Sequence, residues 1–415
     1  MEPPPNSALP TLRDFWLSRR VLPDFEARLS DYAEAIVRIG VNLQPGQRLL
    51  IADPYGQQGV ARSAEVLVEA VTRAAIELGD GVDVIWSPSA DLRTMAEAGD
   101  RRAFDRLVAS NTAKLDRHLR NGGAFLFFTG SQPRLMEGVP AAHLAAFQEI
   151  AWRHFGPIVQ QLMHGASQWC LVPAPSPSWA ALTFADLPSE QRLAALWRCV
   201  FDSVRAVGDG RTVERWNAHL DGLTSDAEKL NAARHSRLRL VGNGTDLSLA
   251  LPAKHHWCTA EQHTKHAVRH VVNLPTEEIF TAPDCRSAEG RVRVARPVCH
   301  AGTTIEGIEL EFHRGCVVSA SARTNADLLR ELLATDGGAV RLGEVALLAS
   351  DLDAPRPAWQ TARTVFHHPL LDENAANHIA LGEAYPFCHR GWWKWRLNRS
   401  LVHVDLPLDA HVTLE

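Results

Sequence analysis

The sequence has no long hydrophobic run, no paired-cysteine motif and no apolar leader. A membrane-spanning helix needs about 18 or more consecutive apolar residues, and no such run occurs in the 415 residues, so we expect no membrane span. The first ten residues, MEPPPNSALP, lack the basic region and apolar stretch of a secretory signal. The seven cysteines are odd in number and include no CxxC pair, which argues against a disulfide framework or a thiolate zinc site. We therefore expect a cytoplasmic protein with free thiols.

Several ligand-binding and nucleophile motifs are also missing. No GxGxxG or GxxxxGK(S/T) loop follows a predicted strand, so a nucleotide site has no support. No GxSxG segment occurs and no cysteine lies in a papain-like context, so a serine or cysteine nucleophile is not indicated. The net charge of -5 gives no electrostatic reason to expect nucleic acid as a partner.

The length of the chain indicates two domains. A chain of 415 residues is too long for one comfortable core, and 46% hydrophobic with 22% charged residues is ordinary for a globular protein. We expect a proline-rich arm over residues 1–30, an α/β domain over 31–235 and a second domain over 236–415.

Short apolar runs alternate with helical patterns in the first of these domains. Strands are predicted over 48–54, 82–88, 123–130 and the start of 168–180, and helices over 25–40, 59–79, 101–122 and 141–155. Strands that alternate with helices of about 12 or more residues favour parallel βαβ units. The sequence therefore predicts an open, mostly parallel sheet.

The pattern changes near residue 236. Five strand-like segments follow with few helices between them: RLRLVGNGTDLSLAL, HAVRHVVNLP, GRVRVARPV, IEGIELEFHRGCVVSASA and SLVHVDLPLDAHVTLE. Two helices are predicted here, over 325–335 and 373–385. The second domain is therefore predicted to be α+β and rich in antiparallel strands, and almost all of the candidate chemistry lies in it.

The segment DENAANHIALGEAY, residues 372–385, holds three groups that bind metals or move protons among small residues. As a helix capped by Asp372, it places His378 and Tyr385 on one face, two turns apart, because they are seven residues apart. Glu373 is then expected to point from the first turn into the same cavity. A helix with a satisfied polar face is the alternative for this segment alone.

Three further segments carry carboxylates or imidazoles. His403 and Asp405 in LVHVDL share one face of a strand, where they form half of a metal site or the polar face of an edge strand. Glu277 and Glu278 in NLPTEEIF point opposite ways in an extended segment, so one can face solvent and the other a site. Glu344 in RLGEVAL lies among apolar residues, where a glutamate is either exposed or paired.

A histidine cluster elsewhere invites a zinc assignment that we do not favour. His263, His266 and His270 have the spacing of one helical face. Nineteen histidines make chance clusters common, and no carboxylate or thiolate pattern completes this one.

Six ordered segments resemble the aminopeptidase T / AmpS / PepS family of dinuclear metallo-aminopeptidases. They are GNGTDLSLAL, NLPTEEIFTAP, EGRVRVARP, LGEVALL, LDENAANHIALGEAY and HVD, and their order and approximate spacing also match. The resemblance starts near DYAEAIVRIGVNLQPGQRLLI and ends at HVD. It implies a two-domain build and a homodimer that partly encloses the active site.

The resemblance also implies a set of metal-site residues at matching positions: Glu278, Glu344, Glu373, His378, Tyr385, His403 and Asp405. Four carboxylates and two imidazoles can hold two divalent ions about 3.5–4 Å apart, and the ligand types suit Zn²⁺, Co²⁺ or Mn²⁺. Glu373 and Tyr385 are the expected catalytic residues. A free carboxylate, Glu373 or Glu344, takes a proton from water, and Tyr385 coordinates a metal or donates a hydrogen bond to the oxyanion.

The expected function is removal of N-terminal residues from peptides by a metal-dependent aminopeptidase. Two features depart from the family pattern: the chain stops soon after HVD, and the loop GWWKWR, residues 391–396, is unusually aromatic and basic. That loop is either a packed or oligomer-contact loop or part of a reshaped substrate pocket. The alternatives are a metalloenzyme on the same scaffold acting on another small substrate, such as a hydrolase or a mononuclear-iron dioxygenase, and a non-catalytic dimeric binding protein.

Overall fold

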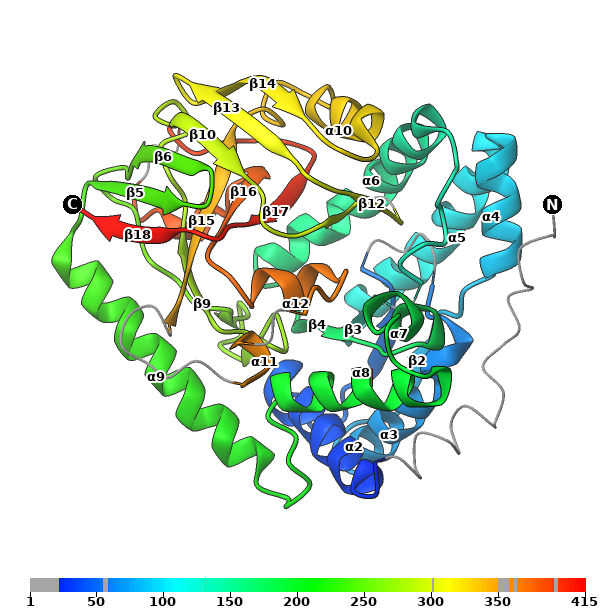
Figure 1. Ribbon diagram of the computed structural model, residues 1–415. Coiled ribbons are helices and arrows are strands. Elements are labelled where there is room, and N and C mark those ends of the chain that lie inside the picture. The colour runs from blue at the N-terminus through cyan, green and yellow to red at the C-terminus, as the bar shows by residue number, and fades with distance from the viewer. Residues whose placement is uncertain are drawn as a thin grey trace.

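The computed structural model describes residues 22–54, 59–130, 132–300, 302–349, 358–361, 364–391 and 395–415. Most of the predicted arm over residues 1–30 lies outside this part of the chain. The described residues form one parallel sheet of four strands, two antiparallel sheets of six and four strands, and two two-stranded hairpins (Figure 1).

The first half of the chain alternates helices and strands, as predicted. Its strands are β1 (Leu49–Ala52), β2 (Val82–Val84), β3 (Ala124–Thr129) and β4 (Trp169–Pro173), which pair in parallel in the order β2-β1-β3-β4. The helical elements around them are α2 (Phe25–Glu34), the π-helix η1 (Ala35–Gly40), the 3-10 turn η2 (Arg62–Ala64), α3 (Glu65–Ile76), α4 (Ser89–Ala98), α5 (Arg101–Arg120) and α6 (Ala141–Met163). β1 and β3 are buried apolar runs, as strands covered on both faces require. The predicted parallel sheet is confirmed.

Three helices connect the parallel sheet to the rest of the chain. They are α7 (Pro177–Thr183), α8 (Ser189–Ser203) and α9 (Thr212–Ala233). α7 starts soon after β4 because Ser176 caps it, its side chain accepting the Trp179 N–H. In Figure 1, α9 runs along the edge of the molecule toward the antiparallel sheets.

The second half of the chain is antiparallel, which confirms the predicted α+β character. The six-stranded sheet has the order β14-β13-β10-β6-β5-β18 and consists of β5 (Arg237–Gly242), β6 (Thr245–Ala250), β10 (Glu289–Arg293), β13 (Glu309–His313), β14 (Cys316–Ser321) and β18 (His411–Leu414). The four-stranded sheet has the order β17-β16-β15-β9 and consists of β9 (Glu278–Thr281), β15 (Leu342–Leu348), β16 (His378–Gly382) and β17 (His403–Pro407). One hairpin pairs β7 (Glu261–His263) with β8 (Arg269–Val271), and the other pairs β11 (Val298–His300) with β12 (Thr303–Ile305).

Few helices lie among these strands. They are α10 (Ala326–Leu333), α11 (Ala358–Thr361), α12 (Pro369–Glu373) and the 3-10 turn η4 (Pro386–Cys388). α10 confirms the helix predicted over 325–335. Among the described residues, no helix has the length and apolar character needed to cross a membrane.

The helix predicted over 373–385 is wrong. α12 ends at Glu373, and β16 begins at His378 as an inner strand between β15 and β17. Ile379 and Leu381 alternate with smaller or polar residues, which is the period of two that fits a strand. Gly382 has a φ of 102°, and a Cβ there would lie 1.9 Å from the Val402 carbonyl oxygen, so only glycine fits beside β17.

Asp372 is not the cap of this helix either. It lies inside α12, and His368 is the N-cap, accepting the Leu371 N–H. α12 contacts both β4 and β17, so it lies where the parallel sheet meets the four-stranded sheet (Figure 1). One continuous hydrophobic core includes Leu126 of β3 and Ile379 of β16. The change from parallel to antiparallel pairing falls between β4 and β5, and the domain boundary at residues 235 and 236 stays a prediction.

Candidate metal centre

Neighbouring strands of the four-stranded sheet bring five of the predicted site residues together. Glu278 opens β9, Glu344 lies in β15, His378 opens β16, and His403 and Asp405 lie in β17. Side chains two residues apart on a strand point to the same face, which is why His403 and Asp405 lie side by side, as predicted. The strands alternate direction, so residues far apart in the sequence become lateral neighbours.

Small residues provide the floor between these groups. Ala380 pairs with Glu344 on one side and with Asp405 on the other, and Ala346 pairs with His378. Directly paired residues have Cβ atoms about 4.5–5.5 Å apart. A methyl group between two longer side chains therefore leaves a space that their charged ends can surround. The small residues of the segment 372–385 serve the site from a strand and not from a helix.

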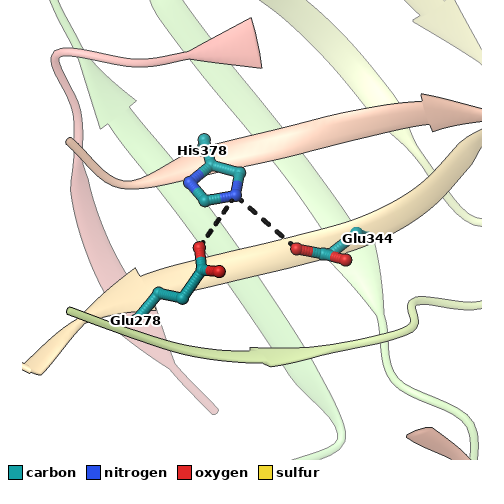
Figure 2. A group of neighbouring side chains, drawn as sticks. All are labelled: Glu278, Glu344 and His378. Carbon is teal, nitrogen blue, oxygen red and sulfur yellow. Dashed lines mark ion pairs between the residues drawn. The ribbon is translucent and has the colours of Figure 1, made fainter. Parts of the chain in front are cut away.

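The first group of converging side chains consists of Glu278, Glu344 and His378. His378 Nε2 lies 3.2 Å from Glu278 Oε2 and 3.5 Å from Glu344 Oε1. Figure 2 shows the His378 imidazole pointing at the carboxylate of Glu344 on the adjacent strand β15 and at that of Glu278 on β9, one strand further along the sheet. The three ligand atoms lie within 4.8 Å of one another, close enough to surround one cation.

A second group shares Glu344 with the first. His403 Nε2 lies 3.3 Å from Asp405 Oδ1 and 3.8 Å from Glu344 Oε2. These ligand atoms also lie within 4.8 Å of one another. Glu344 thus directs one oxygen toward each imidazole, which is the arrangement of a carboxylate that can bridge two ions.

Backbone carbonyls orient both imidazoles. His403 Nδ1 lies 2.8 Å from the carbonyl oxygen of Glu383, and His378 Nδ1 lies 3.4 Å from that of Ala376. Because a carbonyl can only accept, Nδ1 donates in both cases and Nε2 faces the carboxylates. Metal-binding histidines are commonly held in this way through their second nitrogen.

Two carboxylate oxygens of the cluster have no hydrogen-bond donor. Glu278 Oε2 and Glu344 Oε2 are buried and accept no hydrogen bond from the described residues, although imidazole nitrogens approach them at ion-pair distance. Burying a carboxylate oxygen without a donor is costly. A divalent cation beside each oxygen would satisfy it, and a set of carboxylates and imidazoles is the donor set that borderline divalent metals take. The residues present therefore fit a metal ion.

Burial and mutual charge shift the protonation of the cluster. Burial raises the pKa of Glu278 to about 8, assisted by the neighbouring Glu344 and Asp405 carboxylates. Burial alone would lower the pKa of His378, but the hydrogen bond and charge of Glu344 with those of the other carboxylates outweigh it and raise that pKa to about 9. The pKa of His403 rises to about 10, because Asp405 likewise outweighs its burial. Protons thus hold the carboxylates together in the metal-free protein, and a metal would displace them.

Glu373 lies beside the two groups without belonging to either. It is buried at the end of α12, where its Oε1 accepts the Asn374 Nδ2–H at 3.3 Å and its carboxyl hydrogen-bonds Asp405. Burial, together with the charges of Asp405 and Glu278, raises its pKa well above the ordinary value.

Tyr385 follows β16 and also flanks the cluster. Its ring stacks on Phe387 with centroids 5.3 Å apart and lies 4.9 Å from the His403 ring. Burial, then the nearby carboxylates, raises the pKa of its phenol well above 10.0, so the phenol keeps its proton. The helical face predicted to join His378 to Tyr385 does not exist, but β16 and the turn after it still bring both residues to the site.

Two other sequence expectations need correction. Glu277 does not face solvent: it is buried, and its Oε1 lies 2.6 Å from the Arg205 guanidinium. His263 and His270 lie on the paired strands β7 and β8, not on a helix, and His266 lies in the turn between them. Within the described ranges, these histidines form no group of three potential metal ligands.

Two asparagines that sequence reasoning missed hold the site segment in place. Asn374 Oδ1 accepts the Glu277 N–H at 2.7 Å, and Asn377 Oδ1 accepts the Leu348 N–H at 2.9 Å. Both are buried and join the segment between α12 and β16 to neighbouring strands. Their only signal in the sequence is their position next to Glu373 and His378.

Comparison with known proteins agrees with this site. A family model described as thermophilic metalloprotease (M29) matches residues 25–412. Aminopeptidase T of Thermus thermophilus is 35% identical over 392 residues, which cover 93% of each chain. Aminopeptidase AmpS of Bacillus subtilis is 31% identical over 398 residues, which cover 94% of each chain. The solved structure of wild-type AmpT from Thermus thermophilus matches with a TM-score of 0.79 and 33% identity, covering 94% of this chain and 98% of that chain. The chain therefore belongs to the M29 family of metalloproteases.

Proposed function

We propose that this protein is a metal-dependent aminopeptidase that removes N-terminal residues from peptides with water activated between two divalent ions. The observation that carries the proposal is the pair of ligand groups that share Glu344. The related aminopeptidases T and AmpS, which match along almost the whole chain, support the same activity.

Each ligand group would hold one ion in the proposed site. Glu278, Glu344 and His378 would hold one, and Glu344, His403 and Asp405 the other. When bound, such ions polarise a scissile carbonyl and lower the pKa of a water toward neutrality. The donor set suits Zn²⁺, Co²⁺ or Mn²⁺.

Glu373 and Tyr385 are the proposed catalytic side chains. Glu373 is buried within hydrogen-bonding reach of Asp405 and belongs to neither ligand group, so it is the candidate general base. Its pKa is raised in the metal-free protein, and the positive charge of bound ions would favour the carboxylate form that takes the proton of the attacking water. Tyr385 keeps its phenol proton and can donate a hydrogen bond to the developing oxyanion. This favours Glu373 over Glu344 as the base, because Glu344 is shared between the two ligand groups.

An apolar cluster beside the ligands supports docking of an apolar first side chain. Phe280 is two residues after Glu278 on β9 and so lies on the same face. It packs with Ala346 and Cys388, and Tyr385 and Phe387 lie against this cluster. The loop GWWKWR is expected to be either a packed or oligomer-contact loop or part of a reshaped substrate pocket, and its Trp392 and Trp393 lie outside the described residues. Trp395 of the same loop is 56% exposed, with the Arg286 and Arg396 guanidiniums over its ring.

The proposal includes a homodimer and a cytoplasmic location. The resemblance to the aminopeptidase T / AmpS / PepS family supports the dimer, and seven free cysteines support a reducing compartment. The proposed substrate is a peptide, and the net charge of -5 gives no electrostatic reason to expect nucleic acid as a partner.

The test combines metal analysis with a substrate panel. Metal-stripped protein is titrated with Zn²⁺, Co²⁺ or Mn²⁺, and bound metal is measured beside cleavage of aminoacyl anilides, short peptides and the same peptides with an acetylated N-terminus. We expect two ions per chain at saturation, at least one of them labile, and cleavage only of substrates with a free terminus. One bound iron with oxygen-dependent turnover of a small aromatic substrate would instead favour the dioxygenase alternative. A metal-free protein that still binds a ligand would favour the non-catalytic one.

A further inference from the structure

The helix that carries Glu373 is held from outside the four-stranded sheet. His368, the N-cap of α12, is fully buried, and its Nε2 lies 3.0 Å from the Oγ1 of Thr129. Thr129 is the last residue of β3, at the carboxyl end of the parallel sheet. The Trp179 ring of α7 stacks on the His368 ring, with centroids 4.5 Å apart and planes at 21°. The α/β part of the chain thus holds the start of α12 through one hydrogen bond and one ring stack.

The hydrogen bonds at this contact form a chain with one direction. The Nδ1 of His368 accepts the Leu371 N–H, so the ring proton sits on Nε2 and is donated to Thr129 Oγ1. The hydroxyl of Thr129 in turn donates to the Val172 carbonyl of β4 at 3.0 Å. Burial lowers the pKa of His368 to about 3, which keeps the ring neutral and this arrangement fixed.

A second anchor lies two residues before His368. The carbonyl oxygen of Phe366 accepts the Trp179 Nε1–H at 2.6 Å and the Thr183 hydroxyl at 2.9 Å. Gly130, which follows Thr129, packs directly against the His368 ring: a Cβ at this position would lie 2.1 Å from His368 Cδ2. The imidazole is therefore enclosed by Trp179 and the end of β3.

The Asp372 carboxylate ties together the turn between these anchors and Glu373. Asp372 Oδ1 accepts the Phe366 N–H at 3.0 Å, and Oδ2 accepts the His368 N–H at 2.9 Å. The Arg296 guanidinium bonds the same carboxylate at 3.0 Å. Because Asp372 precedes Glu373 directly, any shift of His368 is passed to Glu373 through one short helical turn.

We propose that Thr129, Trp179 and His368 are positioning residues that orient Glu373, so that the parallel sheet aims the base while the antiparallel sheet holds the metal ligands. This inference rests on the proposed function, because it takes Glu373 as the base. None of the three residues belongs to either ligand group. Loosening them is therefore expected to lower kcat, while KM and metal content stay unchanged.

The sharpest variant is Thr129→Val, which keeps the shape of the side chain and removes the hydroxyl. We expect kcat to fall between about threefold and thirtyfold, since misplacement of a catalytic group by about 1 Å costs on the order of a hundredfold. Thr129→Ser keeps the hydroxyl and should recover most of the wild-type kcat. The matched control is Thr245→Val in the six-stranded sheet, which removes a buried hydroxyl bonded to Arg293. It should leave kcat unchanged even if the melting temperature drops.

The measurements are kcat and KM on an aminoacyl anilide, bound metal per chain, and the melting temperature of each variant. A wild-type kcat in Thr129→Val with the hydroxyl gone overturns the inference, and so does an equal fall in the Thr245→Val control. A loss of metal in Thr129→Val also overturns it, because the contact would then act on the ligands. If Thr129→Val does not fold, Trp179→Phe keeps the stacking and removes the bond to Phe366, with the same expected result. Metal-loaded wild-type protein that cleaves no substrate defeats the proposed function itself, and this is known before any variant is made.

Discussion

At the scale of single residues, Glu344 stands apart from the other ligands. Its Oε1 lies 3.5 Å from His378 Nε2 and its Oε2 lies 3.8 Å from His403 Nε2. Glu278 belongs only to the first ligand group, and Asp405 only to the second. In the proposed two-ion site, loss of Glu278 or Asp405 would weaken mainly one metal position, whereas loss of Glu344 would weaken both.

Glu344→Gln is therefore expected to remove most of the bound metal and with it the activity. The amide keeps the size of the side chain but cannot bridge two cations with two anionic oxygens. We expect bound metal to drop from two ions per chain to one or fewer. We expect kcat to fall by a factor of about 100 or more, because metal ions supply several kcal/mol of transition-state stabilisation. Elemental analysis after dialysis measures the first effect. Glu311→Gln, on the exposed side of β13, is the control that should change neither. Two tightly bound ions in Glu344→Gln would contradict the bridging role.

Glu373→Gln tests whether Glu373 acts as the general base without being a metal ligand. Glutamine fills the same space and cannot accept the proton of the attacking water, so kcat should fall by about 10²–10⁴. Because Glu373 lies outside both ligand groups, two ions should still bind. Steady-state kinetics and metal content on the same preparation check both parts. If one ion is lost, Glu373 is a ligand as well, as the family resemblance allows.

At the scale of elements, the parallel sheet, the strand with His403 and Asp405, and the change to antiparallel strands could all be predicted. Each rests on a local signal: apolar runs between helical patterns, or alternation along one strand. The helix prediction for residues 373–385 failed because an alanine-rich sequence has high helix propensity. Two flanking strands override that preference at β16. The alternation of Ile379 and Leu381 was the signal that indicated a strand.

The contacts that complete the site lie beyond such local signals. Asn374 accepts a hydrogen bond from the N–H of Glu277, the residue just before β9. The Glu277 carboxylate forms an ion pair with Arg205, which lies in the segment between α8 and α9. Neither pairing leaves a trace in sequence spacing, because the partners are brought together only by the packing of distant elements. The same holds for His368 and Thr129.

Ala380→Val tests whether the small residues of β16 make room for the ions. Valine suits a strand, but its added methyl groups would intrude between Glu344 and Asp405. We expect metal affinity to fall tenfold or more, since overpacking of a filled site costs about 1–3 kcal/mol. Titration with Zn²⁺ or Co²⁺ under a competing chelator measures the change. Ile379→Val on the opposite face is the control, expected to cost about 0.5–1.5 kcal/mol of stability and to leave metal affinity unchanged. Equal affinities in the two variants would show that Ala380 does not line the metal space.

At the scale of the whole molecule, metal ions and protons compete for the same side chains, and this competition affects the stability of the fold. His378 and His403 have folded pKa values raised from 6.5 to about 9 and about 10. Their stabilisation of the metal-free fold is complete below pH 6.5 and is lost as the pH rises through 9 and 10. Glu278, raised from 4.5 to about 8, acts in the same direction, since its contribution is lost as the pH rises toward 8. The lowered pKa of Asp405 acts only in acid, where its contribution is lost.

The site's titration should therefore cost the metal-free protein stability between pH 6 and pH 9 relative to metal-loaded protein. The groups of the metal-free site hold more protons in the folded state than in the unfolded chain, so their contribution to the free energy of unfolding falls with pH. Buried histidines outside the site, such as His219 and His270, have lowered pKa values and contribute in the opposite direction as the pH rises through 6.5. Bound metal requires the same groups without those protons, so metal affinity rises with pH. Urea unfolding with a chelator, and again with saturating Zn²⁺, at four pH values gives both curves. Their difference cancels the titrations outside the site and should widen toward pH 9. His403→Ala should flatten the metal-free slope, because one raised pKa is gone. A metal-induced gain that shrinks from pH 6 to pH 9 would show that protons do not hold these carboxylates together.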